Sequence, residues 1–407
     1  MKKTVLRSYA RLIARAGVNI RPGQEVFIEA DLDQPEFVQM LVEECYKCKA
    51  KKVVVDWNYQ PLQKIHYRYR TLTTLGKVEN YEEARWQHYV DTIPCRIYLI
   101  SEDPDGLKGI NQEKMAKAQQ KRYPIAKPYR DAIENKYQWC IAAVPGKAWA
   151  KKLFPELRPA AAVEKLWENI LATSRVDDDP IAAWETHNKD LHDRCAYLNS
   201  LHIEKLHYTS ATGTDFTVGM IPEGRFCGGS EKSLQGIVFN PNIPSEEVFT
   251  SPMKGQAEGI VYSTRPLSYR GTMIENFSIH FENGRVTEVK AEKGEDALKT
   301  LVNMDEGSKM LGECALVPFD SPIRNSGIMF YNTLFDENAA CHLALGDGFA
   351  NCIKNFENYT LEQCREMGIN SSMIHEDFMI GSEDLDITGE TENGERVQIF
   401  KNGNWAF

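Results

Sequence analysis

Acidic and imidazole side chains occur inside an otherwise small and apolar stretch, NTLFDENAACHLALGDGF, at residues 332–349. Asp336, Glu337 and His342 are the residues of this stretch whose chemistry needs an explanation. Burying an unpaired charge is expensive unless the charge is paired or bound to a metal ion. We therefore expect partners for these side chains elsewhere in the chain.

The spacing of Glu337 and His342 limits how they can act together. They are five residues apart, so neither a strand nor a helix directs both side chains to the same side. They serve one metal ion only across a bend, or two ions from one segment. The spacing therefore favours two ions over one.

A second histidine and acid occur in SSMIHEDFMIGS, at residues 371–382. His375 and Asp377 are two apart in strand-like sequence, so a strand directs both to the same side, and Glu376 faces away. An imidazole and a carboxylate projecting together suit half of a metal site, while a buried His–Asp ion pair explains the pattern equally well.

Two further segments place acids next to apolar residues. In NIPSEEVFTSP, alternation sends Glu246 and Glu247 to opposite faces, so at most one of them belongs to an inward site. In DEGSKMLGECALVPF, Glu313 lies between Leu-Gly and Cys-Ala-Leu-Val, where a solvated acid is not expected.

These segments together offer four carboxylates and two imidazoles, a set typical of paired Zn, Mn or Co ions rather than of structural zinc. The predicted metal ligands are Glu247, Glu313, Glu337, His342, His375 and Asp377. Asp336 fits a turn or a supporting position better than a ligand position. No cysteine is required, because Cys45 and Cys48 continue an apolar helical stripe and no second Cys or His pair follows within about 20 residues.

The first half of the chain has the pattern of a parallel sheet. Apolar runs at 25–32, 51–57, 95–101 and 138–144 alternate with amphipathic helical segments, which predicts βαβ units. The pattern is helical between about 147 and 200. We expect an N-terminal α/β domain over 1–200, with a largely parallel sheet and a helical linking layer.

From about residue 202 the pattern changes to β structure. Hairpin turns are predicted at Asn283-Gly284, Asn393-Gly394 and Asn402-Gly403. We therefore expect a mostly β (α+β) domain over 201–407, which contains all six candidate metal ligands. No Walker-type loop or dinucleotide fingerprint occurs, so the α/β half has no evident phosphate site.

The composition limits which classes of binding partner and which cellular compartment are expected. The net charge of −10, without a block of five like charges, disfavours nucleic acid and anionic membranes as partners. No apolar run approaches the roughly 18 residues needed to span a bilayer, and the N-terminus lacks a signal-peptide core. Ten cysteines without a secretory signal indicate reduced thiols, so we expect a cytoplasmic protein.

Four ordered phrases, NIPSEEVFTSP, MDEGSKMLGECALV, NTLFDENAACHLALG and HEDFMIGS, closely resemble the signatures of the thermophilic aminopeptidase family of metallopeptidases, the aminopeptidase T and aminopeptidase S group. The resemblance implies a two-metal exopeptidase with an α/β domain, a mostly β catalytic domain and a homodimer enclosing the active sites. It places the family's ligands on the same six residues and its metal-bridging carboxylate on Glu313.

The predicted function is a dinuclear metal-dependent aminopeptidase that releases N-terminal residues from peptides with a free N-terminus. Glu313 and Glu247 are the candidates for the carboxylate that moves the proton from water to the leaving amine. Phe349 stands where the family typically has a tyrosine near the metals, so a hydrogen-bond donor is missing there. A catalytically weakened metal- and peptide-binding homologue, or another dinuclear amide hydrolase, is the alternative.

Overall fold

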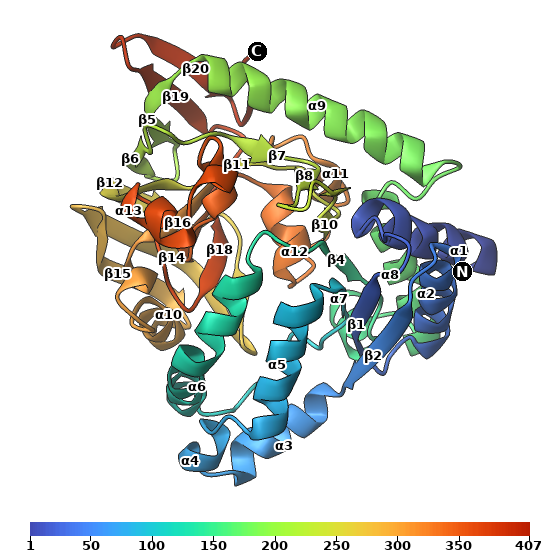
Figure 1. The fold of residues 1–407 in the computed structure, drawn as a ribbon. Helices are drawn as coiled ribbons and strands as arrows, with labels where there is room; N and C mark the ends of the chain where they lie inside the picture. Colours follow the sequence, from blue (N-terminus) through green and yellow to red (C-terminus); the bar gives the residue numbers. More distant parts are fainter. The chain divides into compact units, whose positions relative to one another are not determined.

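The computed structural model describes residues 1–407, which divide into two compact units (Figure 1). The first unit contains Met1–Lys189 and Ser230–Ser245, and the second contains Asp190–Gly229 and Glu246–Phe407. The chain therefore leaves the first unit near residue 189 and returns to it for one short segment. The functional domains expected at 1–200 and 201–407 stay a prediction.

The first unit is built around a parallel five-stranded sheet with the order β10-β4-β3-β1-β2. Its strands are β1 (Glu25–Asp31), β2 (Lys52–Asn58), β3 (Cys95–Ile100), β4 (Trp139–Ala143) and β10 (Asn242–Ile243). The four long strands form where the apolar runs predicted them. Their inward side chains are fully buried, for example Val26, Ile28 and Ile97.

Helices surround this sheet, as expected for parallel strands joined by crossovers. They are α1 (Lys3–Leu12), α2 (Pro35–Lys47), α3 (Gln60–Tyr69), α4 (Leu72–Leu75), α5 (Asn80–Thr92), α6 (Gln112–Ile133), α7 (Lys147–Leu153) and α8 (Pro159–Thr173). Helix α9 (Pro180–Ser200) begins in the first unit and continues into the second. The ring of Tyr9 lies 5.4 Å from Phe37 and 6.4 Å from Trp167, so α1, α2 and α8 share one aromatic core.

The second unit contains two antiparallel sheets. The smaller has the order β18-β17-β16-β11-β7. Its strands are β7 (Cys227–Gly228), β11 (Val248–Thr250), β16 (Leu311–Leu316), β17 (His342–Gly346) and β18 (His375–Met379). Every residue of β11, β16 and β17 is buried, including the acid of β16 and the histidine of β17.

The larger sheet has nine strands and contains all three predicted hairpins. They are β5 (Ile203–Thr209), β6 (Asp215–Met220), β12 (Pro252–Tyr262), β13 (Leu267–Tyr269), β14 (Thr272–Glu282), β15 (Arg285–Lys293), β19 (Asp386–Thr391), β20 (Arg396–Lys401) and β21 (Asn404–Trp405). Asn283-Gly284 and Asn402-Gly403 join consecutive strands with positive φ at both residues, as a type I′ turn requires. The predicted fold class is confirmed.

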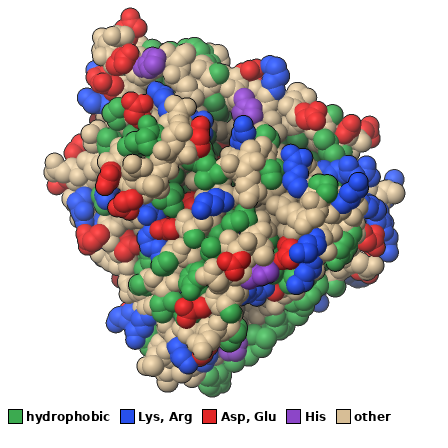
Figure 2. Space-filling view, in the orientation of Figure 1, with side chains coloured by type: hydrophobic (Ala, Val, Ile, Leu, Met, Phe, Trp, Pro, Cys, Tyr) green, Lys and Arg blue, Asp and Glu red, His purple; other side chains and the backbone are tan.

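None of the helices is long and apolar enough to cross a membrane. On the face shown in Figure 2, basic and acidic side chains are interspersed rather than gathered into a single stripe.

Candidate metal centre

Strand alternation places four of the six predicted ligands on one face of the smaller antiparallel sheet of the second unit, β18-β17-β16-β11-β7. Glu313 on β16 lies opposite Ala344 on β17, and Ala344 lies opposite Asp377 on β18. His342 precedes Ala344 by two residues, and His375 precedes Asp377 by two. Since opposed residues and residues two apart share a face, all four side chains project to the same side.

Small residues on this face leave room between the ligands. Ala315 is opposite His342, and Gly346 is opposite His375. Gly346 has a φ of 107°, and a Cβ there would lie 2.1 Å from the carbonyl oxygen of Ile374. A larger side chain at this position is therefore excluded by the backbone of the neighbouring segment.

The other two predicted ligands approach from beyond the strands. Glu247 directly precedes β11, and Glu337 begins a 3₁₀ turn (Glu337–Ala339) after the short helix α12 (Thr333–Asp336). The side chain of Asn338 joins these two segments, because its Oδ1 accepts the Glu246 N–H at 2.6 Å and its Nδ2 donates to the Leu334 carbonyl at 2.9 Å. The chain bends at Ala340, between the 3₁₀ turn that holds Glu337 and the strand that begins at His342.

The ligand atoms form two overlapping groups of three, Glu247-Glu313-His342 and Glu313-His375-Asp377. Within each group the atoms lie within 4.8 Å of one another. The Nε2 of His342 is 3.3 Å from Glu247 Oε2, and the Nε2 of His375 is 3.0 Å from Glu313 Oε2. Glu313 is common to both groups.

Backbone carbonyls orient both imidazole rings. The Nδ1 of His342 is 3.2 Å from the Ala340 oxygen, and the Nδ1 of His375 is 2.8 Å from the Asp347 oxygen. With Nδ1–H donating to these carbonyls, both Nε2 atoms face the carboxylates. Metal-binding histidines are commonly held in this way.

Burial and mutual repulsion raise the pKa values of two of the acids. Burial raises the pKa of Glu313 to about 7, and nearby Glu247 and Asp377 add to this effect. Burial raises the pKa of Glu337 well above its ordinary value, and the charge of Asp377 raises it further. Both acids therefore resist ionisation in a site that holds no cation.

For the imidazoles, unlike for these two acids, the surroundings favour the charged form. Burial disfavours a charged His342, but the hydrogen bond with Glu247 and the negative charges of Asp377, Glu247 and Glu313 together outweigh burial and raise the pKa of His342 to about 9. Burial also disfavours an ionised Asp377, yet the positive charge of His375 lowers the pKa of Asp377 below its ordinary value. Protonated imidazoles thus supply the positive charge that the carboxylates need.

The side chains present fit a divalent cation. The buried Oδ1 of Asp377 has no hydrogen-bond donor, although it lies 3.3 Å from His375 Nε2 and 3.9 Å from His342 Nε2. None of the four carboxylates forms an ion pair with a lysine or arginine. An oxygen-rich, buried set without a fixed positive partner suits a metal ion.

Glu337 belongs to neither group of three, although its carboxyl group interacts with those of Asp377, Glu247 and Glu313. It is 8% exposed, and the Nδ2 of Asn338 lies 3.4 Å from its Oε1. Glu337 is therefore a buried neighbour of Asp377 that belongs to neither group of three.

Phe349 lies beside the cluster. Its ring is 4.8 Å from that of His375 and 5.5 Å from that of Phe249, and its N–H donates to Ser251 Oγ at 2.8 Å. The side chain thus contacts a predicted ligand and offers no hydroxyl group to the site.

Asp336 takes part in a separate interaction. Its carboxylate accepts the N–H groups of Phe330 and Asn332 at 3.0 Å and pairs with Arg265 Nη2 at 3.1 Å. It therefore fixes the turn that leads into Glu337. The sequence reasoning missed Arg265 and Asn338, and no local pattern marks either one.

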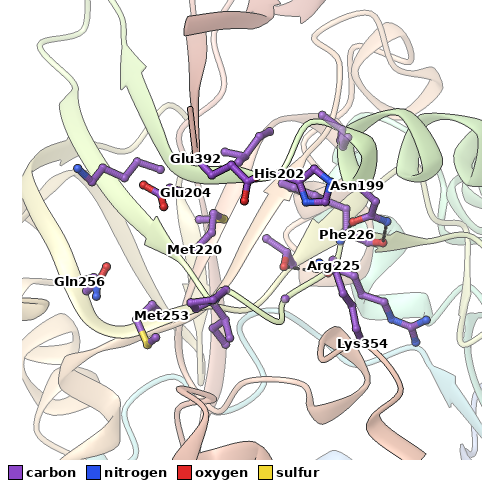
Figure 3. Close-up of a pocket in the computed structure, with 17 residues that line it drawn as sticks. Asn199, His202, Glu204, Met220, Arg225, Phe226, Met253, Gln256, Lys354 and Glu392 are labelled. Carbon is purple, nitrogen blue, oxygen red and sulfur yellow. Dashed lines mark hydrogen bonds between the residues drawn. The ribbon is translucent and has the colours of Figure 1, made fainter. Parts of the chain in front are cut away.

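A different pocket in the second unit has a volume of about 300 Å³ (Figure 3). None of the six predicted ligands lines it. Its labelled side chains include His202, Arg225, Lys354 and Glu392. The pocket is therefore separate from the metal cluster.

Comparison with known proteins agrees with this chemistry. The sequence model of the family described as "Thermophilic metalloprotease (M29)" matches residues 2–405. The chain is 42% identical to aminopeptidase AmpS of Bacillus subtilis over 404 residues, covering 99% of this chain and 98% of the relative. It is 40% identical to aminopeptidase 2 of Geobacillus stearothermophilus, with the same coverage.

A solved structure, wild-type AmpT from Thermus thermophilus, superposes with a TM-score of 0.88 at 37% identity. The match covers 100% of both chains. These matches confirm the resemblance found in the four sequence phrases. The chain belongs to the thermophilic metalloprotease family M29.

Proposed function

We propose that this chain is a dinuclear metal-dependent aminopeptidase. The observation that carries the proposal is the position of Glu313, whose carboxylate belongs to both groups of candidate ligand atoms. A carboxylate shared in this way suits a bridge between two ions. The names of the relatives, which are aminopeptidases, support the reaction.

In this proposal, Glu247 and His342 hold one ion, and His375 and Asp377 hold the other. Glu313, which belongs to both groups of ligand atoms, would serve both ions, and Glu337 would complete the set. Zn, Co and Mn are the candidate metals, since all three accept mixed carboxylate and imidazole ligands.

When bound, such ions lower the pKa of a coordinated water and polarise a substrate carbonyl. The chain's own residues supply the remaining chemistry. Glu313 or Glu247 accepts the proton of the attacking water and returns it to the leaving amine. The carbonyls of Ala340 and Asp347 hold both imidazoles with Nε2 facing the cluster.

The substrates in this proposal are peptides with a free N-terminus. A homodimer acting in the cytoplasm belongs to the same proposal. Neither nucleic acid nor a membrane is a proposed partner.

The test compares free and N-acetylated peptides, together with aminoacyl-anilides, on protein supplied with Zn, Mn or Co. We expect cleavage of the free substrates only, because the proposed reaction needs the free amine. Cleavage of both forms would instead indicate another dinuclear amide hydrolase. No cleavage by the native chain and none by Phe349→Tyr would remove the peptidase proposal.

Phe349 favours a second candidate, a metal- and peptide-binding homologue with weakened catalysis. One missing hydrogen-bond donor reduces a rate by roughly 100-fold or more. Metal occupancy and peptide binding without turnover by the native chain would support this candidate.

The general base can be assigned with Glu247→Gln and Glu313→Gln. The substitution that retains the metal and abolishes turnover identifies the proton carrier. Loss of metal identifies a ligand.

A further inference from the structure

We propose that the first unit has a second ligand site at the carboxyl edge of its parallel sheet. The ligand is a zwitterion with an apolar side chain, either a free amino acid or a short peptide. The site is a cavity of about 710 Å³ lined entirely by residues of the first unit. Its existence does not depend on the peptidase activity of the second unit.

The topology of the sheet supports a ligand site at this place. Strand β1 lies between β2 and β3, so the chain passes from β1 to one side and then crosses to the other. Open α/β sheets bind ligands outside the carboxyl ends of the strands where the order switches in this way. The cavity is lined by Asp31 at the end of β1 and Ser101 directly after β3.

The floor of the cavity is rich in hydrogen-bond acceptors. Asp31 is only 8% exposed and Ser101 only 1%. The Ser101 hydroxyl lies 3.3 Å from Asp31 Oδ2 and 3.1 Å from Asp33 Oδ2. Asp33 Oδ1 also accepts the Lys147 N–H at 3.3 Å. One hydroxyl proton cannot serve both carboxylates, and neither carboxylate forms an ion pair. An ammonium group of a ligand has the donors and the charge that both acids need.

Positive side chains line the same cavity without pairing to these acids. Lys64 and Arg68 come from α3, and Lys147 begins α7. None of the three forms an ion pair. Lys151 also lines the cavity, but its ammonium already donates to the carbonyls of Pro155 and Leu157. The three unpaired cations suit the carboxylate end of a ligand whose ammonium binds at the floor.

Apolar side chains complete the lining. Tyr59 is 51% exposed and Ile65 is 47% exposed, and both line the cavity. Burying them against a ligand side chain is favourable. A phosphate ligand is disfavoured, since Asp31 and Asp33 occupy the loop after β1 where nucleotide folds place glycines.

The test measures binding of L-leucine and of Leu-Leu to the full-length chain by isothermal titration calorimetry. The chain carries His342→Ala, which removes a predicted metal ligand and thereby hydrolysis of the dipeptide. We expect saturable binding of at least one of the two ligands. Leucine alone identifies a free amino acid site, and Leu-Leu alone identifies a peptide site.

Further substitutions in the His342→Ala chain test whether the charged residues of the cavity bind the ligand. Asp31→Asn and Lys147→Met are expected to weaken binding by about tenfold to 100-fold, since each removes a charged partner of the ligand. N-acetyl-leucine and leucinamide, which each lack one ligand charge, are expected to bind more weakly than leucine. The matched controls Asp91→Asn and Lys165→Met change charges outside the cavity and leave affinity unchanged.

Lys147 is exposed, so Lys147→Met keeps the test valid if Asp31→Asn fails to fold. Absence of saturable binding in the His342→Ala chain overturns the proposal, as does equal affinity of Lys147→Met and the Lys165→Met control. Failure of the aminopeptidase proposal appears separately, as absence of metal-dependent cleavage by the native chain.

Discussion

At Glu313 the two groups of ligand atoms overlap, whereas His342 belongs to one group only. In the proposed centre, Glu313→Ala therefore lowers the content of both ions, and His342→Ala lowers the content of one. Elemental analysis of protein dialysed after loading with Zn, Mn or Co measures this difference. His207→Ala is the control, because His207 is exposed and pairs with Asp215 in another sheet. Unchanged stoichiometry in both variants would remove the ligand assignment.

Phe349 permits a gain-of-function prediction. Phe349→Tyr places a phenol beside His375, whose ring is 4.8 Å away. We expect kcat to rise by roughly 10-fold to 100-fold with little change in KM, because a donor that acts on the developing oxyanion favours the transition state over bound substrate. Steady-state kinetics on an unblocked aminoacyl-anilide measures the change. Phe249→Tyr is the control, and an equal rise in that variant would contradict a specific role for Phe349.

Among single elements, the turn between Phe330 and Asp336 depends on a buried ion pair. The side chains of Arg265 and Asp336 are 9% and 3% exposed. Arg265→Met leaves Asp336 buried without its positive partner, so we expect the free energy of unfolding to fall by about 3–5 kcal/mol. Metal content should fall too, since Glu337 follows this turn. Denaturant unfolding and elemental analysis measure the two effects.

Arg285→Met is the matched control for this substitution. Arg285 pairs with Glu306 on the surface, where the side chains are 43% and 76% exposed. Its loss should change the unfolding free energy by less than about 1 kcal/mol. The double variant Arg265→Met/Asp336→Asn should recover part of the stability, because the buried charge is gone. Equal stability of Arg265→Met and Arg285→Met would refute the importance of the buried pair.

At the scale of single helices, strands and turns, the features that local sequence determines were predictable. The strands of the parallel sheet follow their apolar runs, and two Asn-Gly pairs form the expected turns. The common side of His375 and Asp377 follows from a spacing of two. The contribution of Arg265 was not predictable, because its partner Asp336 is 71 residues away and becomes buried only in the folded chain.

For the molecule as a whole, stability should depend on pH and metal together. The pKa of His342 is raised to about 9 from an ordinary 6.5, and that of Glu313 to about 7 from 4.5. A group whose pKa is raised on folding stabilises the fold fully at pH values below its ordinary pKa. This contribution is lost as the pH rises through the pKa of the folded state. Metal-free protein should therefore lose stability between about pH 5 and pH 9.

Metal binding has the opposite dependence, because its ligands must be deprotonated. The difference in Tm between metal-loaded and chelated protein should widen over the same interval. Thermal unfolding at a series of pH values, with and without a chelator, measures it. The His342→Ala variant should show a smaller widening. A constant difference in the native chain would contradict the proposed ligands.

The division of the chain was only partly visible in the sequence. The change to β structure near residue 202 lies close to the start of the second unit at Asp190. The return of Ser230–Ser245 to the first unit was not predicted, since β10 is two residues long and has no periodicity to detect. Its pairing with β4 joins residues about a hundred positions apart.

That returning segment affects the order in which the chain can fold on the ribosome. The sheet of the first unit gains its last strand only when Asn242 and Ile243 have been synthesised. By the time this strand emerges from the ribosome, β5 and β6 of the second unit have already emerged. The N-terminal unit of a growing chain usually folds first and alone. Here the nascent sheet must wait with β4 as an open edge, the kind of surface that chaperones protect from aggregation.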